Sequence, residues 1–148
     1  MAKTALILSI HPRHAAKIFA GRKKVELRRT RPKNLDNGAL ALIYVTSPVR
    51  SLAGAFRVTN VIERPLADLW KMVKNKAGLS FQEFMQYYKG VSIGTAIFFQ
   101  KVWSFREPMS LEDLRNELLV FLPPRTFRYL RVHELAAPRI ARLLAHVS

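Results

Sequence analysis

Residues 21–29 read Gly21-Arg22-Lys23-Lys24-Val25-Glu26-Leu27-Arg28-Arg29. Gly21 is typical of a helix end, and the following residues alternate between polar and apolar as in a strand. This alternation puts Glu26 beside Arg28 on the polar face, opposite Val25 and Leu27. A carboxylate held by flanking cations leaves surplus positive charge for a phosphate. The alternative that the spacing leaves open is an exposed charged strand edge, which protects a sheet against aggregation.

The rest of the chain alternates irregularly between predicted strands and helices. Strands are predicted over residues 4–10, 24–29, 39–45, 49–62 and 94–105, and helices over residues 11–21, 65–74, 80–88, from 110 onward and over 134–147. Gly54 marks a bulge or a close approach, and Pro138 kinks the last helix or sets its true start. Because helices do not regularly separate the strands, the predicted fold class is α+β, a small mixed or mostly antiparallel β-barrel surrounded by helices.

The composition is that of one globular domain. The 148 residues are 49% hydrophobic, and we expect a single domain over residues 1–148 with a C-terminal helical extension over 132–148. Cysteine is absent, which excludes a disulfide scaffold and a thiolate zinc site. No apolar run approaches the roughly 18 residues that span a bilayer. We therefore expect a cytoplasmic protein without metal, cofactor or membrane contact.

Positive charge gathers at the two ends of the chain. Of a formal net charge of +15, residues 1–33 supply 10 basic and 1 acidic side chains, and residues 121–148 supply 5 and 1. Residues 34–120 are nearly balanced, with 10 basic and 8 acidic side chains. Concentrated positive charge repels itself unless a polyanion meets it, so nucleic acid is the expected partner, with an anionic membrane second. The alternative is a basic protein whose charges are merely solvated.

Two further stretches suit nucleic acid. Arginines alternate with aromatic residues over 125–129, where guanidinium groups meet phosphates and aromatic faces stack on unpaired bases. In strand geometry Phe127 and Tyr129 share one face and Arg128 takes the other. The alternative is that both rings close the core. A hydroxyl pair before a proline turn, Thr46-Ser47-Pro48-Val49-Arg50, forms either a phosphate pocket or an ordinary capped turn.

The pattern Gly21-x-Lys23-x-x-Glu26-x-Arg28 resembles the GxKxxExR signature of the ASCH (activating signal cointegrator homology) domain. Residues 8–21, 44–50 and 123–130 are similar to the flanking stretches of ASCH proteins described as transcriptional regulators. The resemblance implies a PUA-like fold with a cleft that faces nucleic acid or a nucleotide. Within that cleft, Lys23 and Arg28 would be cations and Glu26 the polar residue between them.

On this basis we expect a regulatory protein that binds nucleic acid, single-stranded RNA more than DNA. The residues expected at the nucleic acid are Arg13, Lys23, Lys24, Glu26, Arg28, Arg29, Arg31, Ser47, Arg50, Arg125, Arg128 and Tyr129. Among these, Glu26, Ser47, Arg50 and Tyr129 are expected to read one unstacked or modified base. We expect a monomer or weak dimer, and the helix past Val132 is a candidate surface for a protein partner.

The rival hypothesis is a hydrolase that acts on RNA or on a modified nucleoside. Similar small acetylcytidine amidohydrolases carry threonine, their proposed nucleophile, where this chain has Glu26. A ribonuclease activity is also ascribed to an ASCH protein. If the chain is a hydrolase, the candidate catalytic residues are Lys23, Glu26 and Tyr129, with His11 as a further acid–base group. The strongly basic termini favour the binding protein, because an enzyme for free nucleosides has little use for them.

Overall fold

A computed structural model describes residues 5–118 and 120–147. The strands are β1 (Ala5–Ile10), β2 (Val25–Arg28), β3 (Leu40–Val45), β4 (Ser51–Pro65), β5 (Ile93–Ser110) and β6 (Phe127–Tyr129). The helices are α1 (Pro12–Phe19), α2 (Leu66–Val73), α3 (Phe81–Tyr87), α4 (Leu111–Glu117), α5 (Val132–Leu135) and α6 (Pro138–Ala145). Thr4, the predicted first residue of the first strand, lies outside the described residues, as does the last residue of the predicted extension.

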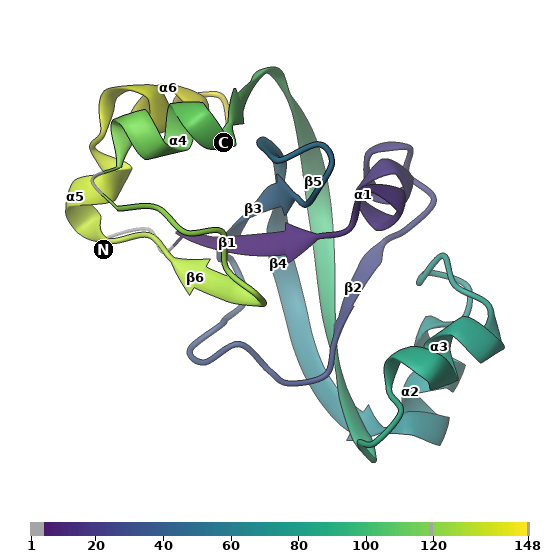
Figure 1. Cartoon of the computed structure of the whole chain (residues 1–148). Coiled ribbons are helices and arrows are strands. Elements are labelled where there is room, and N and C mark those ends of the chain that lie inside the picture. Colours follow the sequence, from purple (N-terminus) through teal and green to yellow (C-terminus); the bar gives the residue numbers. More distant parts are fainter. Residues whose placement is uncertain (1–4, 119, 148) are drawn as a thin grey trace.

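The strands form one curved sheet in the order β2-β5-β4-β3-β1-β6. The β1–β3 pair is parallel, whereas the other four pairings are antiparallel. The sheet is a half-barrel, and helices surround it (Figure 1). The predicted α+β, PUA-like fold is therefore confirmed. The two edge strands, β2 and β6, are not paired with each other in the described chain, so the barrel has an open seam.

The parallel strand β1 is buried on both faces, which explains its continuous apolar sequence. Ala5 and Ile7 pack in one cluster with β3, α4 and α6, whereas Leu6 and Leu8 pack in a second cluster with α1 and the middle of the sheet. Helix α6 contributes Ile140 to the first cluster. The C-terminal segment is therefore part of the same core as the central strands.

A third apolar cluster supports α2 and α3 against β2 and the start of β5. These two helices lie on the other side of the molecule from α4, α5 and α6 (Figure 1). Ser80 caps α3, as predicted, and Glu83 completes a reciprocal capping box. The cap fixes where α3 begins, and with it the position of the side chains that α3 turns toward α1. Within the described residues, no helix is long and apolar enough to span a bilayer.

Several local predictions are confirmed, and two are wrong in part. His11 caps α1, and Ser110 caps α4 through a capping box with Asp113. The predicted last helix is divided into α5 and α6, and Pro138 sets the start of α6. Strand β2 was expected to present one charged face, but all four of its residues are buried. Its charged side chains are buried because they fill the seam.

Gly54 lies at a close approach between β4 and β5, as its position in the sequence predicts. The pairing of these strands shifts register between Leu52 and Gly54. A Cβ atom at residue 54 would collide with the carbonyl oxygen of Trp103 and with the ring of Phe19. The absence of a side chain thus lets α1 pack directly on the sheet.

We expect Gly54→Ala to lower the free energy of unfolding by about 1–3 kcal/mol, because overpacking forces the backbone apart. Urea denaturation measures this loss. The double variant Gly54→Ala/Phe19→Ala should lose less stability than the sum of the losses of the two single variants, because removal of the ring relieves one collision. The collision with the Trp103 carbonyl remains in place, so the relief should be only partial. A stability of Gly54→Ala within about 0.5 kcal/mol of the parent would contradict the close approach.

Candidate functional site

Arg28 spans the open seam of the half-barrel. From edge strand β2, its Nη2 atom donates to the Ser9 carbonyl on β1 at 2.9 Å, and Nη1 donates to the Thr126 carbonyl at 3.2 Å. Nη2 also lies 3.0 Å from the carboxylate of Glu26. Arg28 is 9% exposed and Glu26 is 6% exposed, so the ion pair is buried. One guanidinium therefore joins both ends of the sheet where no strand pairing does.

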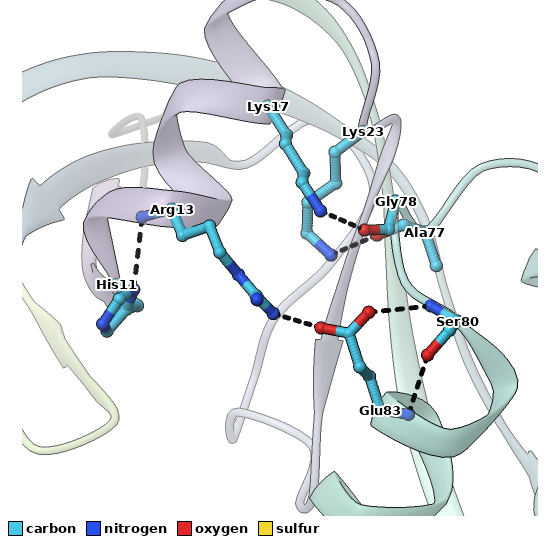
Figure 2. Close-up of polar contacts among 8 residues, drawn as sticks. All are labelled: His11, Arg13, Lys17, Lys23, Ala77, Gly78, Ser80 and Glu83. Atoms are coloured by element: carbon cyan, nitrogen blue, oxygen red, sulfur yellow. Dashed lines mark hydrogen bonds and ion pairs between the residues drawn. The ribbon is translucent and has the colours of Figure 1, made fainter.

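Two lysines fasten the α1–β2 segment to the loop before α3. The Nζ atom of Lys23 donates to the Ala77 carbonyl at 2.7 Å, and that of Lys17 donates to the Gly78 carbonyl at 2.6 Å (Figure 2). Lys23 is only 2% exposed. An ammonium group carries three donor hydrogens, and Lys23 uses one of them on this carbonyl. Lys23 thus holds the loop in place and has two further N–H groups that can donate to other acceptors.

Arg13 and Glu83 connect α1 with α3 on the surface, and in Figure 2 they lie below these lysines. Nη2 of Arg13 pairs with Oε2 of Glu83. The other carboxylate oxygen of Glu83 accepts the Ser80 amide at 3.0 Å, within the capping box. The Ser80 amide and then Arg13 lower the pKa of Glu83 to about 2. Glu83 thus holds Arg13 in place while its own orientation is set by the start of α3.

These contacts surround a pocket of about 340 Å³ beside the seam, which we call the seam pocket. It is lined by Ser9, Ile10, His11, Arg13, His14, Lys23, Glu26, Leu27, Arg28, Leu79, Glu83 and Tyr87. Its volume lies at the lower end of the range for small-ligand sites. Nε of Arg28 and Nδ1 of His14 are buried without a hydrogen-bond partner in the described structure. Such atoms are rare in folded proteins, and a bound ligand or water would satisfy them.

The seam pocket lowers the pKa of two basic groups. Burial, followed by the positive charges of Lys23 and Arg13, lowers the pKa of His14 to about 4. Burial also lowers the pKa of Lys23, although Glu26 opposes this shift. At neutral pH His14 is therefore uncharged, and its imidazole can accept a proton beside several cations. Perturbed groups of this kind gather at functional sites.

The structure brings part of the predicted site together. Arg13, Lys23, Glu26 and Arg28 all line the seam pocket, as does His11. The turn that holds the predicted Ser47 and Arg50 borders the pocket without lining it, since its Thr46 amide donates to the Ile10 carbonyl at 3.1 Å.

The other predicted residues lie outside the seam pocket in the described chain. Tyr129 pairs with Leu6, at the start of β1, and its hydroxyl donates to the Lys33 carbonyl at 2.6 Å. Arg128 lies on the opposite face of β6, where it pairs with Glu134 at 2.6 Å. The remaining predicted cations are exposed on the surface, namely Lys24, Arg29, Arg31 and Arg125. Of the expected base-reading group of Glu26, Ser47, Arg50 and Tyr129, only Glu26 thus lines the seam pocket.

The seam pocket also contains residues that were not among the predicted site residues, and His14, Glu83 and Tyr87 are three of them. His14 follows His11 by one helical turn, and that spacing is its only sequence signal. Glu83 is recognisable as the third residue after the Ser80 cap, but a cap does not indicate a contact with Arg13. Tyr87 comes from α3, and its hydroxyl donates to the Leu27 carbonyl at 3.0 Å. All three depend on the packing of α1 and α3 across the seam.

We expect the His14 imidazole to titrate near pH 4, as measured by NMR of its ring carbons. Lys23→Met should raise this pKa, because Lys23 is the largest of the charges that lower it. The folded-state pKa lies below the ordinary value of 6.5, so the unfolded chain takes up this proton first as the pH falls. The contribution of His14 to stability is therefore complete above pH 6.5 and is lost as the pH falls toward 4.

The variant His14→Gln lacks the titrating group and should lose this part of the pH dependence of unfolding. A His14 midpoint at or above about pH 6 would contradict the burial of the ring among cations.

Comparison with known proteins identifies relatives of the whole arrangement. The family model of the ASCH domain matches residues 8–109. A protein of Zymomonas mobilis named ASCH domain-containing ribonuclease is 30% identical over 128 residues, which cover 86% of this chain and 85% of that protein. Large ribosomal subunit protein uL22 of Ureaplasma parvum is 27% identical over 127 residues, but the match spans only 39% of that protein.

Solved structures show the same fold. The crystal structure of a Ser→Ala variant of the Zymomonas mobilis ASCH protein superposes with a TM-score of 0.85 at 29% identity, over 94% of this chain and 95% of that one. The N-terminal domain of McrB from Staphylothermus marinus, at 10% identity, shares the fold alone, with a TM-score of 0.62 over 99% of this chain and 98% of that one. With its signature residues gathered at the seam and the family match spanning most of its sheet, the chain belongs to the ASCH domain family.

Proposed function

We propose that this protein binds single-stranded RNA and that the seam pocket holds one nucleotide of the strand. The observation that carries the proposal is the pocket itself, where the buried Nε of Arg28 has no partner in the described structure and Lys23 and Arg13 lie nearby. Phosphate and base edges offer the acceptors that these donors lack. Phosphate binding also compensates the cost of gathering cations in a partly buried site.

The contact between Arg13 and Glu83 suits a site that exchanges partners. An exposed ion pair contributes little stability, so a phosphate can replace Glu83 as the partner of Arg13 at small cost. The buried pair of Arg28 and Glu26 is different, because its carbonyl contacts hold the sheet together. We therefore expect Arg13 to contribute to affinity, and Arg28 to contribute mainly to the shape of the pocket.

A second candidate function, ribonuclease activity, is favoured by the name of the Zymomonas mobilis relative and by His14. A general base works best with a pKa near the operating pH, and the pKa of His14, about 4, lies below that range. A bound phosphate offsets the surrounding cations and raises this pKa toward neutrality. His14 would then take the proton of a ribose 2′-hydroxyl as its oxygen attacks the adjacent phosphorus. The bond from phosphorus to the 5′-oxygen of the next nucleotide breaks, which leaves a 2′,3′-cyclic phosphate, and the departing 5′-oxygen takes up a proton from water.

The test is one incubation with labelled single-stranded RNA, matched single-stranded DNA and duplexes across a salt series. We expect retention of RNA that weakens steeply with salt, because phosphate contacts release counterions. Arg13→Ala should weaken binding by about three- to ten-fold and reduce the salt slope by about one unit. The matched control is Arg64→Ala, which removes the same charge from the exposed end of β4 and should change neither. No retention at low salt would overturn the proposal.

Strand integrity in the same samples tests cleavage. If the protein is a ribonuclease, RNA is cut and DNA is not, because DNA lacks the 2′-hydroxyl. His14→Asn should then abolish cleavage while RNA is still retained. Intact RNA under all conditions would leave a binding protein and reject the second candidate. The regulatory role, the protein partner at the C-terminal helix, the oligomeric state and the cytoplasmic location stay predictions.

A further inference from the structure

A second pocket lies between the C-terminal half of β5 and α6, and we call it the β5–α6 pocket. Its volume is about 530 Å³, and it is lined by Trp103, Ser104, Phe105, Arg106, Glu107, Met109, Arg139, Arg142, Leu143 and His146. It shares no lining residue with the seam pocket. Figure 1 shows α6 beside α4, where β5 ends. The volume is in the middle of the range for small-ligand sites.

The floor of the β5–α6 pocket is apolar and includes one indole. Phe105 and Met109 are buried, and they belong to the core cluster beneath α6. Trp103 is only partly buried, and the guanidinium of Arg57 lies 5.8 Å from the centroid of its ring. This cation–π contact restrains the indole while part of its surface faces the pocket. Flat aromatic ligands stack well on such a ring.

The rim of the β5–α6 pocket is cationic. Arg106 and Arg142 are exposed, and neither pairs with a carboxylate within the part of the chain that the structure describes. Arg139 already pairs with Asp113 at 2.9 Å, so it serves to anchor α6 to α4. Glu107 is the single acidic lining residue. Two free guanidinium groups above an aromatic floor favour a ligand that is flat at one end and anionic at the other.

We propose that the β5–α6 pocket binds a nucleotide unit, with its base on Trp103 and its phosphate at Arg106 and Arg142. The proposal goes beyond RNA binding in the seam pocket and does not depend on it. A planar base matches the indole, and a phosphate matches the planar donor fork of arginine. The same chemistry is offered by a free nucleotide and by the phosphorylated end of an RNA strand.

The experiment uses the fluorescence of Trp103 as a local probe. The chain has two tryptophans, and Trp70→Phe leaves Trp103 as the only one while keeping an aromatic ring against Phe81 and Phe84. The full-length Trp70→Phe protein is titrated with AMP, adenosine and inorganic phosphate, and with a short RNA with or without a 5′-phosphate. We expect saturable quenching by AMP, and binding of adenosine at least about five-fold weaker, because it lacks the anion.

Arg142→Ala and Arg106→Ala should each weaken AMP binding by about five-fold. Arg115→Ala, on the neighbouring α4, is the matched control and should leave it unchanged, because Arg115 does not line the pocket. If AMP quenches Trp103 and neither RNA does, the pocket is a site for a free nucleotide. If the RNA with a 5′-phosphate quenches Trp103 and the RNA without it does not, the pocket is a site for the end of a strand. Absence of saturable quenching by AMP and by the phosphorylated RNA would overturn the proposal, as would equal weakening by Arg142→Ala and Arg115→Ala.

The readout is independent of the seam pocket. RNA retention that Arg13→Ala weakens, together with no change at Trp103, would support the proposed function and reject this inference. If the protein retains no single-stranded RNA, and AMP quenches Trp103 equally with and without Arg13→Ala, the result would support this inference and reject the proposed function. Circular dichroism of each variant confirms that a loss of quenching does not come from unfolding.

Discussion

The buried contact of Arg28 across the seam is the interaction on which the rest of the structure depends. The sheet of a half-barrel has two edge strands, and here β2 and β6 are not paired with each other within the described residues. Arg28 joins them by binding carbonyl groups on β1 and before β6, while Glu26 balances its charge. Breaking a buried pair of this kind typically costs about 3–5 kcal/mol, because the remaining charge is left unpaired. The pocket beside the seam exists because side chains, and not strand pairing, close the barrel.

The structural role of the signature residues and their proposed chemical role therefore lie at the same place. Lys23 and Arg28 donate hydrogen bonds to main-chain carbonyls and so fix the walls of the seam pocket. The same burial lowers the pKa of Lys23 and, with the charges around it, that of His14. A site whose cations are held rigidly and partly desolvated is prepared for an anion, since little side-chain entropy remains to be lost on binding.

Local signals were predictable from the sequence, and contacts across the seam were not. Ser80 and Ser110 mark helix starts through bonds within one turn of chain, and Pro138 marks one through its fixed backbone geometry. Gly54 marks a close approach through its missing side chain, although its neighbours are distant in sequence. The fold class followed from the irregular order of strands and helices. By contrast, the Arg28 contact with Thr126 joins residues 98 positions apart. Tyr129 was expected beside Glu26, but the pairing of β6 with β1 carries its hydroxyl to a different loop.

The choice of main-chain acceptors has an evolutionary consequence. Lys17, Lys23 and Arg28 all donate to carbonyl oxygens, which every amino acid supplies. The signature residues Lys23 and Arg28, together with Lys17, thus specify only the donor of each contact, while the residues that accept these hydrogen bonds can be replaced without losing the acceptor. The donor and the acceptor residue need not change together, so covariation among relatives would not reveal these contacts. Only the conservation of the donor residues would show that the contacts exist.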